Sequence, residues 1–130
     1  NEIARRNLVR NGYSSDQHPL CTANVFDYFR DMHEEFDLII LDPPAYGHGA
    51  NGEKWKLEDQ IREMTQLVTS LLDPDDSFLL MNTYSLGFSS LILENLFAET
   101  PLKNRIATGE IFLLSETKQK LPLGVWARSS

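Results

Sequence analysis

A run of large apolar residues, Leu38–Leu41, ends at a carboxylate near the middle of the chain. Apolar and polar positions do not alternate in this run, which is typical of a strand that helices cover on both faces of a parallel sheet. Asp42 follows it, and then Pro43 and Pro44, which lack amide donors and cannot continue a central strand. The pattern predicts a strand over Phe36–Asp42 and a rigid loop after it.

Helical spacing of apolar residues marks four further segments. The clearest has Leu57, Ile61, Met64, Val68 and Leu71 spaced four or three residues apart, which predicts a helix whose apolar stripe faces the core. The other helices are predicted over Glu2–Arg10, from about Val25 to Glu34, and from about Ser89 to Glu99. The side chains expected to turn inward from these three helices are Ile3, Leu8 and Val9; Val25, Tyr28, Phe29 and Met32; and Leu91, Leu93 or Leu96, and Phe97.

Short apolar runs predict the remaining strands, over Pro19–Ala23, Ser77–Thr83, Glu110–Glu116 and Leu123–Arg128. The last two are separated only by Thr117–Pro122, which is too short for a crossover helix, so they should form an antiparallel hairpin. The earlier segments alternate strand and helix. The expected fold class is therefore α/β, with a doubly wound, mostly parallel sheet and a C-terminal antiparallel hairpin.

Polar residues follow two of the predicted strands at the edge where ligands bind in open α/β sheets. Asp42 ends one strand, and Asn82–Ser85 ends another. One interpretation is a strand-terminating turn without chemistry, since Asp-Pro is a common way to open a turn. We favour a functional site, because the apolar run, the acid, the two prolines and the aromatic Tyr46 occur together. The glycine-rich loop Gly47–Gly52 could close over a ligand, but it lacks the pattern of a phosphate-binding loop.

Composition and charge narrow the function classes. With 130 residues the chain is one domain or less, and 12 basic against 19 acidic side chains give a net charge of −7. This negative net charge argues against electrostatic binding of nucleic acid by this chain itself, so a basic surface that binds nucleic acid would have to lie elsewhere. The lone Cys21 excludes a disulfide framework and a cysteine-rich zinc site, and it is expected to be a buried filler. The three histidines lack metal-ligand spacing, so no metal site is predicted. No membrane span or signal peptide is seen, and a cytoplasmic location is expected.

Taken in order, the segments resemble a class I S-adenosylmethionine-dependent methyltransferase. They are more closely similar to the bacterial ribosomal-RNA methyltransferase family that includes the 23S rRNA cytosine-5 enzymes. The matching pieces, which run almost end to end, are Ala4–Asn7 with Asn11-Gly12, Asn24–Phe26, Phe36–Gly47, Gly52–Trp55, Asn82–Ser85 and Leu121–Arg128.

The resemblance implies S-adenosylmethionine as cofactor and an RNA substrate, held through a module missing from this chain. It also implies that residues 1–130 are the later two-thirds of a catalytic domain, without the N-terminal cofactor-binding strands. We therefore expect a hole in the sheet and a bare hydrophobic edge along Phe36–Leu41. By itself the chain should bind the cofactor poorly and be inactive, unless another copy supplies the strands. The oligomeric state is left open.

The same resemblance assigns roles to individual residues. Asp42 would orient the acceptor group, Pro43 and Pro44 would fix the backbone, and Tyr46 would stack on a flipped-out base. Asn24, Val25 and Asp42 would contact the cofactor. The Asn24 amide suits the adenine ring, but a helix cap is an equal alternative for this side chain. Lys54 and Trp55 could border the substrate channel, with Trp55 equally an anchor for the loop.

Two departures from the family pattern limit the chemistry. Cytosine-5 transfer needs a cysteine thiolate, and neither Asn82–Ser85 nor the double proline has a cysteine beside it. Ala45 separates the second proline from Tyr46, which disfavours an exocyclic amine as target. Two further hypotheses stay open: a methyltransferase that acts on a protein or small molecule, and a noncatalytic Rossmann-like assembly module.

Overall fold

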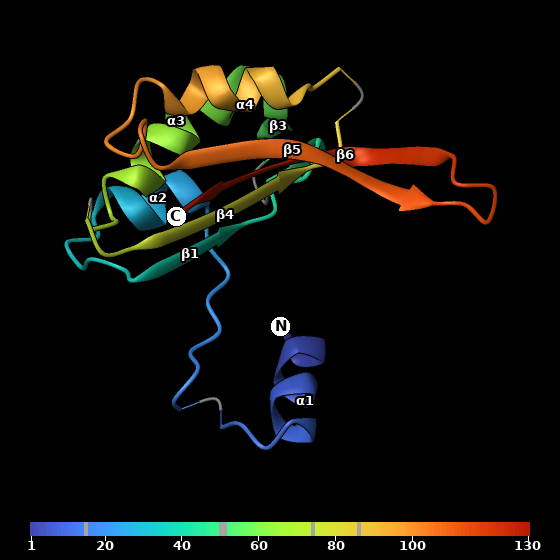
Figure 1. Ribbon diagram of the computed structural model, residues 1–130. Helices are drawn as coiled ribbons and strands as arrows, with labels where there is room; N and C mark the ends of the chain where they lie inside the picture. The colour runs from blue at the N-terminus through green and yellow to red at the C-terminus, as the bar shows by residue number, and fades with distance from the viewer. Residues whose placement is uncertain (15, 50–51, 74, 86) are drawn as a thin grey trace.

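The computed structural model describes residues 1–14, 16–49, 52–73, 75–85 and 87–130. Its elements, in chain order, are α1 (Glu2–Arg10), α2 (Val25–Arg30), β1 (Leu38–Leu41), β2 (Tyr46–His48), β3 (Lys54–Lys56), α3 (Leu57–Thr69), β4 (Phe78–Thr83), α4 (Ser90–Phe97), β5 (Ile106–Leu114) and β6 (Lys120–Ser129). Figure 1 shows that α3 and α4 lie against a sheet, while α1 stands apart at the end of an extended segment.

The main sheet has the strand order β1-β4-β6-β5. β1 and β4 are parallel, with Leu41 opposite Met81, and this confirms the predicted α/β pairing that places Asp42 beside Asn82. β6 runs antiparallel to both β4 and β5, so the predicted C-terminal hairpin is confirmed and is longer than expected. Within the described residues, parallel pairing in this sheet is confined to β1 and β4, so the sheet is mixed and not mostly parallel as predicted, because β6 returns between β4 and β5 as the arm of a hairpin.

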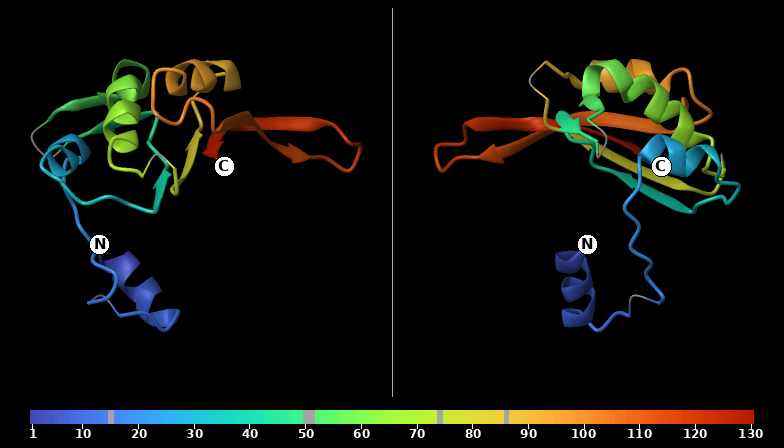
Figure 2. Two further views of the ribbon diagram at one scale, coloured as in Figure 1. Left: turned by 60° about the vertical axis from the view of Figure 1, so that its left-hand side comes forward. Right: turned by 180° about the vertical axis from the view of Figure 1, so that it is seen from behind.

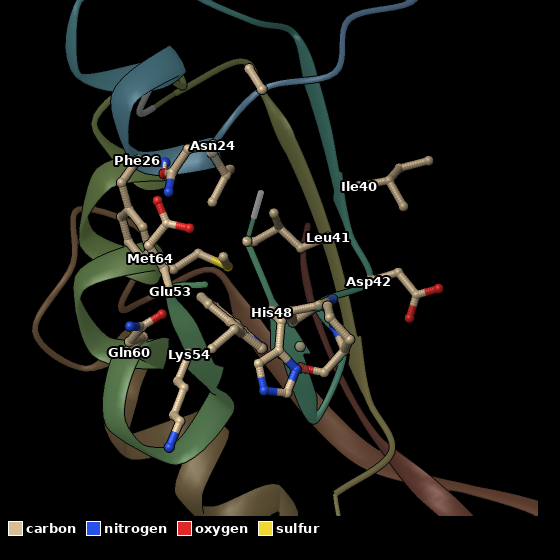
Figure 3. Close-up of a pocket in the computed structure, with 17 residues that line it drawn as sticks. Asn24, Phe26, Ile40, Leu41, Asp42, His48, Glu53, Lys54, Gln60 and Met64 are labelled. Carbon is tan, nitrogen blue, oxygen red and sulfur yellow. Dashed lines mark hydrogen bonds between the residues drawn. The ribbon is translucent and has the colours of Figure 1, made fainter. Parts of the chain in front are cut away.

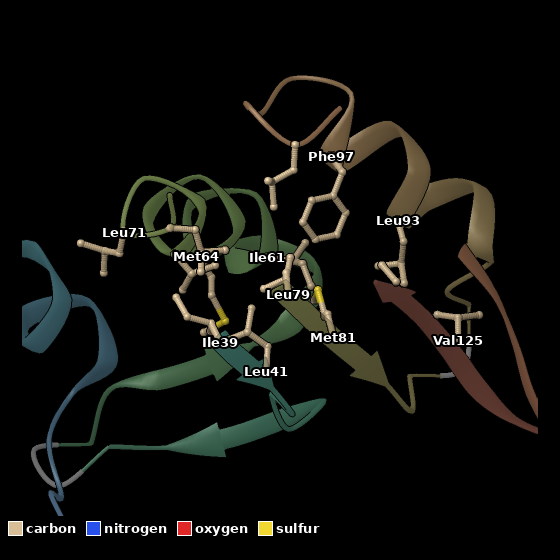
Figure 4. Packing of buried hydrophobic residues seen from close by; sticks show 14 of the residues in the cluster. Ile39, Leu41, Ile61, Met64, Leu71, Leu79, Met81, Leu93, Phe97 and Val125 are labelled. Carbon is tan, nitrogen blue, oxygen red and sulfur yellow. The ribbon is translucent and has the colours of Figure 1, made fainter. Parts of the chain in front are cut away.

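The hydrophobic core lies between one face of this sheet and the helices α3 and α4 (Figure 4). Its members are Ile39, Leu41, Leu57, Ile61, Met64, Val68, Leu71, Leu72, Leu79, Met81, Leu93, Phe97, Leu102, Val125 and Ala127. The predicted stripe of α3 is confirmed, since all five of its residues are buried. Alternate residues of β1 and β4 supply the facing layer, as the two-residue period of a strand requires.

The described residues leave the opposite face of the sheet uncovered, contrary to the expectation that helices cover these strands on both sides. Leu38 and Ile40 are 51% and 62% exposed, and Phe78, on the same face, is 38% exposed. The three helices nearest the sheet gather on the other side (Figure 2). β1 is also an edge strand in the described part of the chain. Leu38 and Ile40 are therefore exposed on the uncovered face, while the expectation that missing strands leave Phe36–Leu41 as a bare edge stays a prediction.

Two predictions for the N-terminal region are wrong. α1 forms over the predicted residues, but it buries no side chain, and Ile3 and Val9 are 76% and 67% exposed. No strand forms over Pro19–Ala23, where the chain is extended without a partner. A strand needs the hydrogen bonds of a neighbour, and the described residues offer none beside this segment.

Local differences concern single side chains. α2 ends at Arg30 rather than at about Glu34; within it Phe26 packs against the core in place of Tyr28, which is exposed. Leu91 and Cys21 are also exposed, although both were expected inside. Within the described residues, no helix has both the length and the apolar character that crossing a bilayer requires.

Candidate active site

A pocket of about 590 Å³ opens beside the carboxyl end of β1 (Figure 3). Four segments line it: the start of α2, the end of β1 with the two prolines, the hairpin of β2 and β3, and the first turns of α3. The lining residues are Ala23, Asn24, Val25, Phe26, Ile40, Leu41, Asp42, Pro43, Pro44, Gly47, His48, Gly49, Glu53, Lys54, Trp55, Gln60 and Met64. The pocket therefore joins Asn24 and Val25 to the Asp-Pro-Pro segment, as the sequence predicted.

The hairpin of β2 and β3 replaces part of the expected glycine loop. Gly47 lies opposite Trp55, and a side chain at Gly47 would meet the Trp55 Cβ at 3.5 Å. The indole Nε1 of Trp55 donates a hydrogen bond to the carbonyl oxygen of Pro44, and its ring lies 6.1 Å from that of Phe26. Trp55 thus anchors the hairpin to the double proline, which favours the anchor interpretation. Ala50 and Asn51, inside the predicted loop, lie outside the described residues.

Asn24 caps α2. Its Oδ1 accepts hydrogen bonds from the backbone amides of Phe26 at 2.9 Å and of Asp27 at 3.4 Å. The carboxamide oxygen is thereby engaged, and the Nδ2 group keeps its capacity to donate. The helix-cap interpretation is confirmed. A contact with adenine would be made by Nδ2 and by an acceptor nitrogen of the ring.

Asp42 directly follows β1, at the carboxyl end of the strand. Its carboxylate projects from the same side of β1 as Ile40 and away from Asn24 and Met64 (Figure 3). Asn82 Nδ2 donates a hydrogen bond to Asp42 Oδ1 at 2.7 Å. The parallel pairing of β1 and β4 thus brings these two side chains together, and the amide fixes the direction of the carboxylate.

Tyr46 does not line this pocket, and neither does the predicted polar cluster Asn82–Ser85. The side chain of Tyr46 is 68% exposed, and it lies opposite Lys56 in the hairpin, on the other face from Trp55. Two residues in β2 point to opposite faces when they are adjacent, so Tyr46 and Gly47 diverge. Stacking of Tyr46 on a base stays a prediction, and it would take place outside the pocket.

The pocket residues that sequence reasoning missed include Glu53, Gln60 and Met64, the last of which was assigned only to the core. A signal for two of them existed, because Gln60 precedes Met64 by four residues and shares its helical face. Glu53 directly precedes β3, so its place in the pocket could have been predicted only if the hairpin of β2 and β3 had been predicted.

A polar contact links the start of α3 to the loop after β4. Ser85 Oγ donates to Glu58 Oε1 at 2.9 Å. The backbone amide of Glu58, and then the Ser85 hydroxyl, hold the pKa of the Glu58 carboxyl below its ordinary value. Glu58 is therefore an anion at neutral pH, in the first turn of a helix where negative charge is favourable.

Comparisons with known proteins show which sequences and folds the chain is similar to. No protein-family model matches the chain. Two similar curated proteins are named ribosomal RNA large subunit methyltransferase K/L, from Alcanivorax borkumensis (29% identity over 52% of this chain) and Shewanella pealeana (30% identity over 61%). The matches cover 10% and 11% of these relatives, so the chain spans only about a tenth of their length.

The matches to solved structures cover more of this chain than the sequence matches do, and they concern its fold. A SAM-dependent methyltransferase from Agrobacterium tumefaciens superposes with a TM-score of 0.68 and 23% identity, over 82% of this chain and 38% of that one. A methyltransferase structure in complex with SAH has a TM-score of 0.61 and 18% identity, over 84% of this chain and 30% of that one. The chain has part of the methyltransferase fold. The predicted resemblance to class I methyltransferases is confirmed.

Proposed function

We propose that this chain is part of an S-adenosylmethionine-dependent methyltransferase that acts on ribosomal RNA. The observation that carries the proposal is the meeting of Asn24-Val25 and Asp42-Pro43-Pro44 in one pocket at the carboxyl end of β1. This is the edge where α/β sheets bind ligands. The names of the curated relatives support ribosomal RNA as the substrate, and the neighbour that binds SAH supports the cofactor.

The pocket fits the adenosyl part of the cofactor. Its volume of about 590 Å³ falls within the range of small-molecule sites. Val25, Phe26 and Met64 give it apolar walls, while Asn24 Nδ2 can donate to a ring nitrogen of adenine. When bound, the cofactor supplies a methyl group on a sulfonium for in-line transfer.

Asp42 acts on the acceptor. The Asp42 carboxylate projects from the opposite side of β1 from Asn24. The acceptor group therefore approaches Asp42 from beyond the carboxyl ends of β1 and β4. There Asp42 accepts a hydrogen bond from the acceptor group and directs its lone pair at the methyl carbon. The Pro44 carbonyl oxygen accepts a hydrogen bond from the Trp55 indole, so the backbone of the double proline is held in place beside Asp42.

We also propose that residues 1–130 form the later two-thirds of a catalytic domain. The exposed edge of β1 and the partial coverage of the solved methyltransferases support this assignment. The negative net charge supports a separate basic module as the main anchor for RNA. Such an enzyme would work in the cytoplasm, beside its substrate.

Calorimetry with S-adenosylmethionine tests the proposal on the natural full-length polypeptide. Ser caps helices about as well as Asn but is too short to reach the ring, so Asn24→Ser should weaken cofactor binding about tenfold without loss of stability. Asn95→Ser, on the exposed side of α4, is the matched control. The 130-residue chain alone should bind weakly. If S-adenosylmethionine does not bind to the full-length polypeptide, the proposed methyltransferase function is wrong.

The substrate is tested separately. Transfer of a radioactive methyl group from the cofactor should label ribosomal RNA rather than protein when the full-length polypeptide is mixed with ribosomal subunits. Label in protein alone would favour the alternative of a protein methyltransferase.

A further inference from the structure

The hairpin of β2 and β3 gathers its aromatic and cationic side chains on one face. Tyr46 pairs with Lys56, and His48 pairs with Lys54. Residues directly opposite in an antiparallel pair share a face, so these four side chains lie together. Gly47 and Trp55, between them, belong to the other face. We call Tyr46, His48, Lys54 and Lys56 the basic face; all four are exposed.

The basic face contrasts with the charge of the chain as a whole. Two lysines stand on it without an acidic residue among the four, although the chain has a net charge of −7. Asp59 reaches it, with its Oδ1 3.8 Å from Lys56 Nζ, and Lys56 also acts electrostatically on the neighbouring Glu58 carboxylate. Both side chains of the pair of Lys56 and Asp59 are well exposed, and a surface ion pair of this kind is weak. A phosphate group could replace Asp59 as the partner of Lys56.

The basic face begins at the mouth of the pocket. His48 and Lys54 belong to it and also line the pocket, whereas Tyr46 and Lys56 lie beyond the lining. Trp55 holds the hairpin through the Pro44 carbonyl, so the position of the face relative to Asp42 is fixed. The hairpin is therefore held close to Asp42, within reach of a polymer whose reacting unit lies near that carboxylate.

We propose that the basic face binds a single-stranded RNA segment that flanks the methylated nucleotide. Lys54 and Lys56 contact phosphates, and Tyr46 stacks on a base next to the target. This inference rests on the proposed function and adds the path of the substrate. Cations interleaved with an aromatic ring are the pattern of single-strand binding, in which lysines follow the backbone and rings stack on bases. An acidic peptide would satisfy the lysines but would leave Tyr46 without a stacking partner.

Fluorescence anisotropy with a labelled single-stranded RNA of about twelve nucleotides tests the inference on the natural full-length polypeptide. Tyr46→Ala should weaken RNA binding about tenfold, the loss expected when one stacked base loses its aromatic partner. Lys56→Ala should weaken it about fivefold and lower the slope of log affinity against log salt by about 0.7, the value for one phosphate contact on a single strand. Lys103→Ala, an exposed lysine outside the hairpin, is the control.

The variants separate binding from folding and from cofactor binding. Lys56 makes no side-chain cap to α3, so its replacement removes no helix contact of that kind. Both variants should keep the wild-type melting temperature and affinity for S-adenosylmethionine. If both variants retain wild-type RNA affinity and salt slope while the cofactor still binds, the inference is wrong and the proposed function stands. Equal binding of an oligoglutamate of the same length, lost in the same variants, would also overturn it in favour of a peptide ligand. A wild-type protein that fails to bind cofactor would instead contradict the proposed function.

Discussion

At the scale of single residues, the contact between Asn82 and Asp42 is the best-defined polar interaction of the candidate site. The 2.7 Å hydrogen bond joins the ends of two parallel strands, where the backbone sets the separation of the side chains. A carboxylate that must accept a hydrogen bond from a reacting group needs a fixed direction. Asn82 is therefore a positioning residue for Asp42.

Replacement of Asn82 by Ala should lower kcat about tenfold, which corresponds to about 1.4 kcal/mol of barrier. The KM for S-adenosylmethionine should stay near wild type, because Asn82 does not line the pocket. Kinetics of RNA methylation by the natural full-length polypeptide measure both quantities, with Asn104→Ala as an exposed control. An unchanged kcat, or a fall matched by a lower melting temperature, would contradict the positioning role.

The direction of the Asp42 side chain is a residue-scale feature that the sequence could not supply. A strand has a period of two, so Asp42 follows Ile40 to one face and Leu41 points to the other. The apolar residues at all four positions of β1 concealed which face the helices cover. For Asn24, by contrast, the sequence left a helix cap and an adenine contact as equal alternatives, and the structure shows the cap.

At the scale of elements, α4 shows how strictly one helix face is used. Leu93 is fully buried against the sheet, whereas Leu91, two residues earlier, is 61% exposed. Residues two apart on a helix do not share a face. Leu91 is therefore a matched exposed control for the buried Leu93 on the same helix.

Leu93→Ala should destabilise the chain by about 2–5 kcal/mol, since it removes buried atoms and leaves a cavity. Leu91→Ala should change the free energy of unfolding by less than about 0.5 kcal/mol, as expected for an exposed site. Urea unfolding followed by circular dichroism measures both. Similar values for the two variants would show that α4 does not pack on the sheet through Leu93.

Elements with a strong local pattern were predicted, whereas the short hairpin of β2 and β3 and the extended state of Pro19–Ala23 were not. The spacing of Leu57, Ile61 and Met64 is sufficient to define α3. The segment Pro19–Ala23 has strand composition but no neighbour to pair with in the described residues, and it stays extended. The hairpin of β2 and β3 was missed because each strand has only three residues beside a glycine-rich turn. Its stability comes from Trp55 and Pro44, a contact between residues 11 positions apart.

At the scale of the whole molecule, the sheet has one covered and one bare face. Leu38 and Ile40 of β1 and Phe78 of β4 form adjacent rows on the bare face, with Leu38 opposite Phe78. Exposed apolar surface beside an unpaired strand edge favours association with other chains. Sequence reasoning expected both faces of β1 to be covered, so the exposure of this face was not predicted, and the absence of further strands beside β1 stays a prediction.

Ile40→Lys tests the consequence in solution. The isolated 130-residue chain should self-associate through this face, and light scattering should give a mass above its monomer value of 14.9 kDa. A lysine at Ile40 places charge on the apolar surface and should shift the mass toward the monomer, while Leu91→Lys, an equally exposed position on α4, should not. In the larger catalytic domain proposed above, any strand or helix that covers Ile40 would bury it, so the same change should lower the melting temperature there, because an unpaired charge is costly inside. A monomeric wild-type chain that binds no hydrophobic dye would show that this face does not drive association.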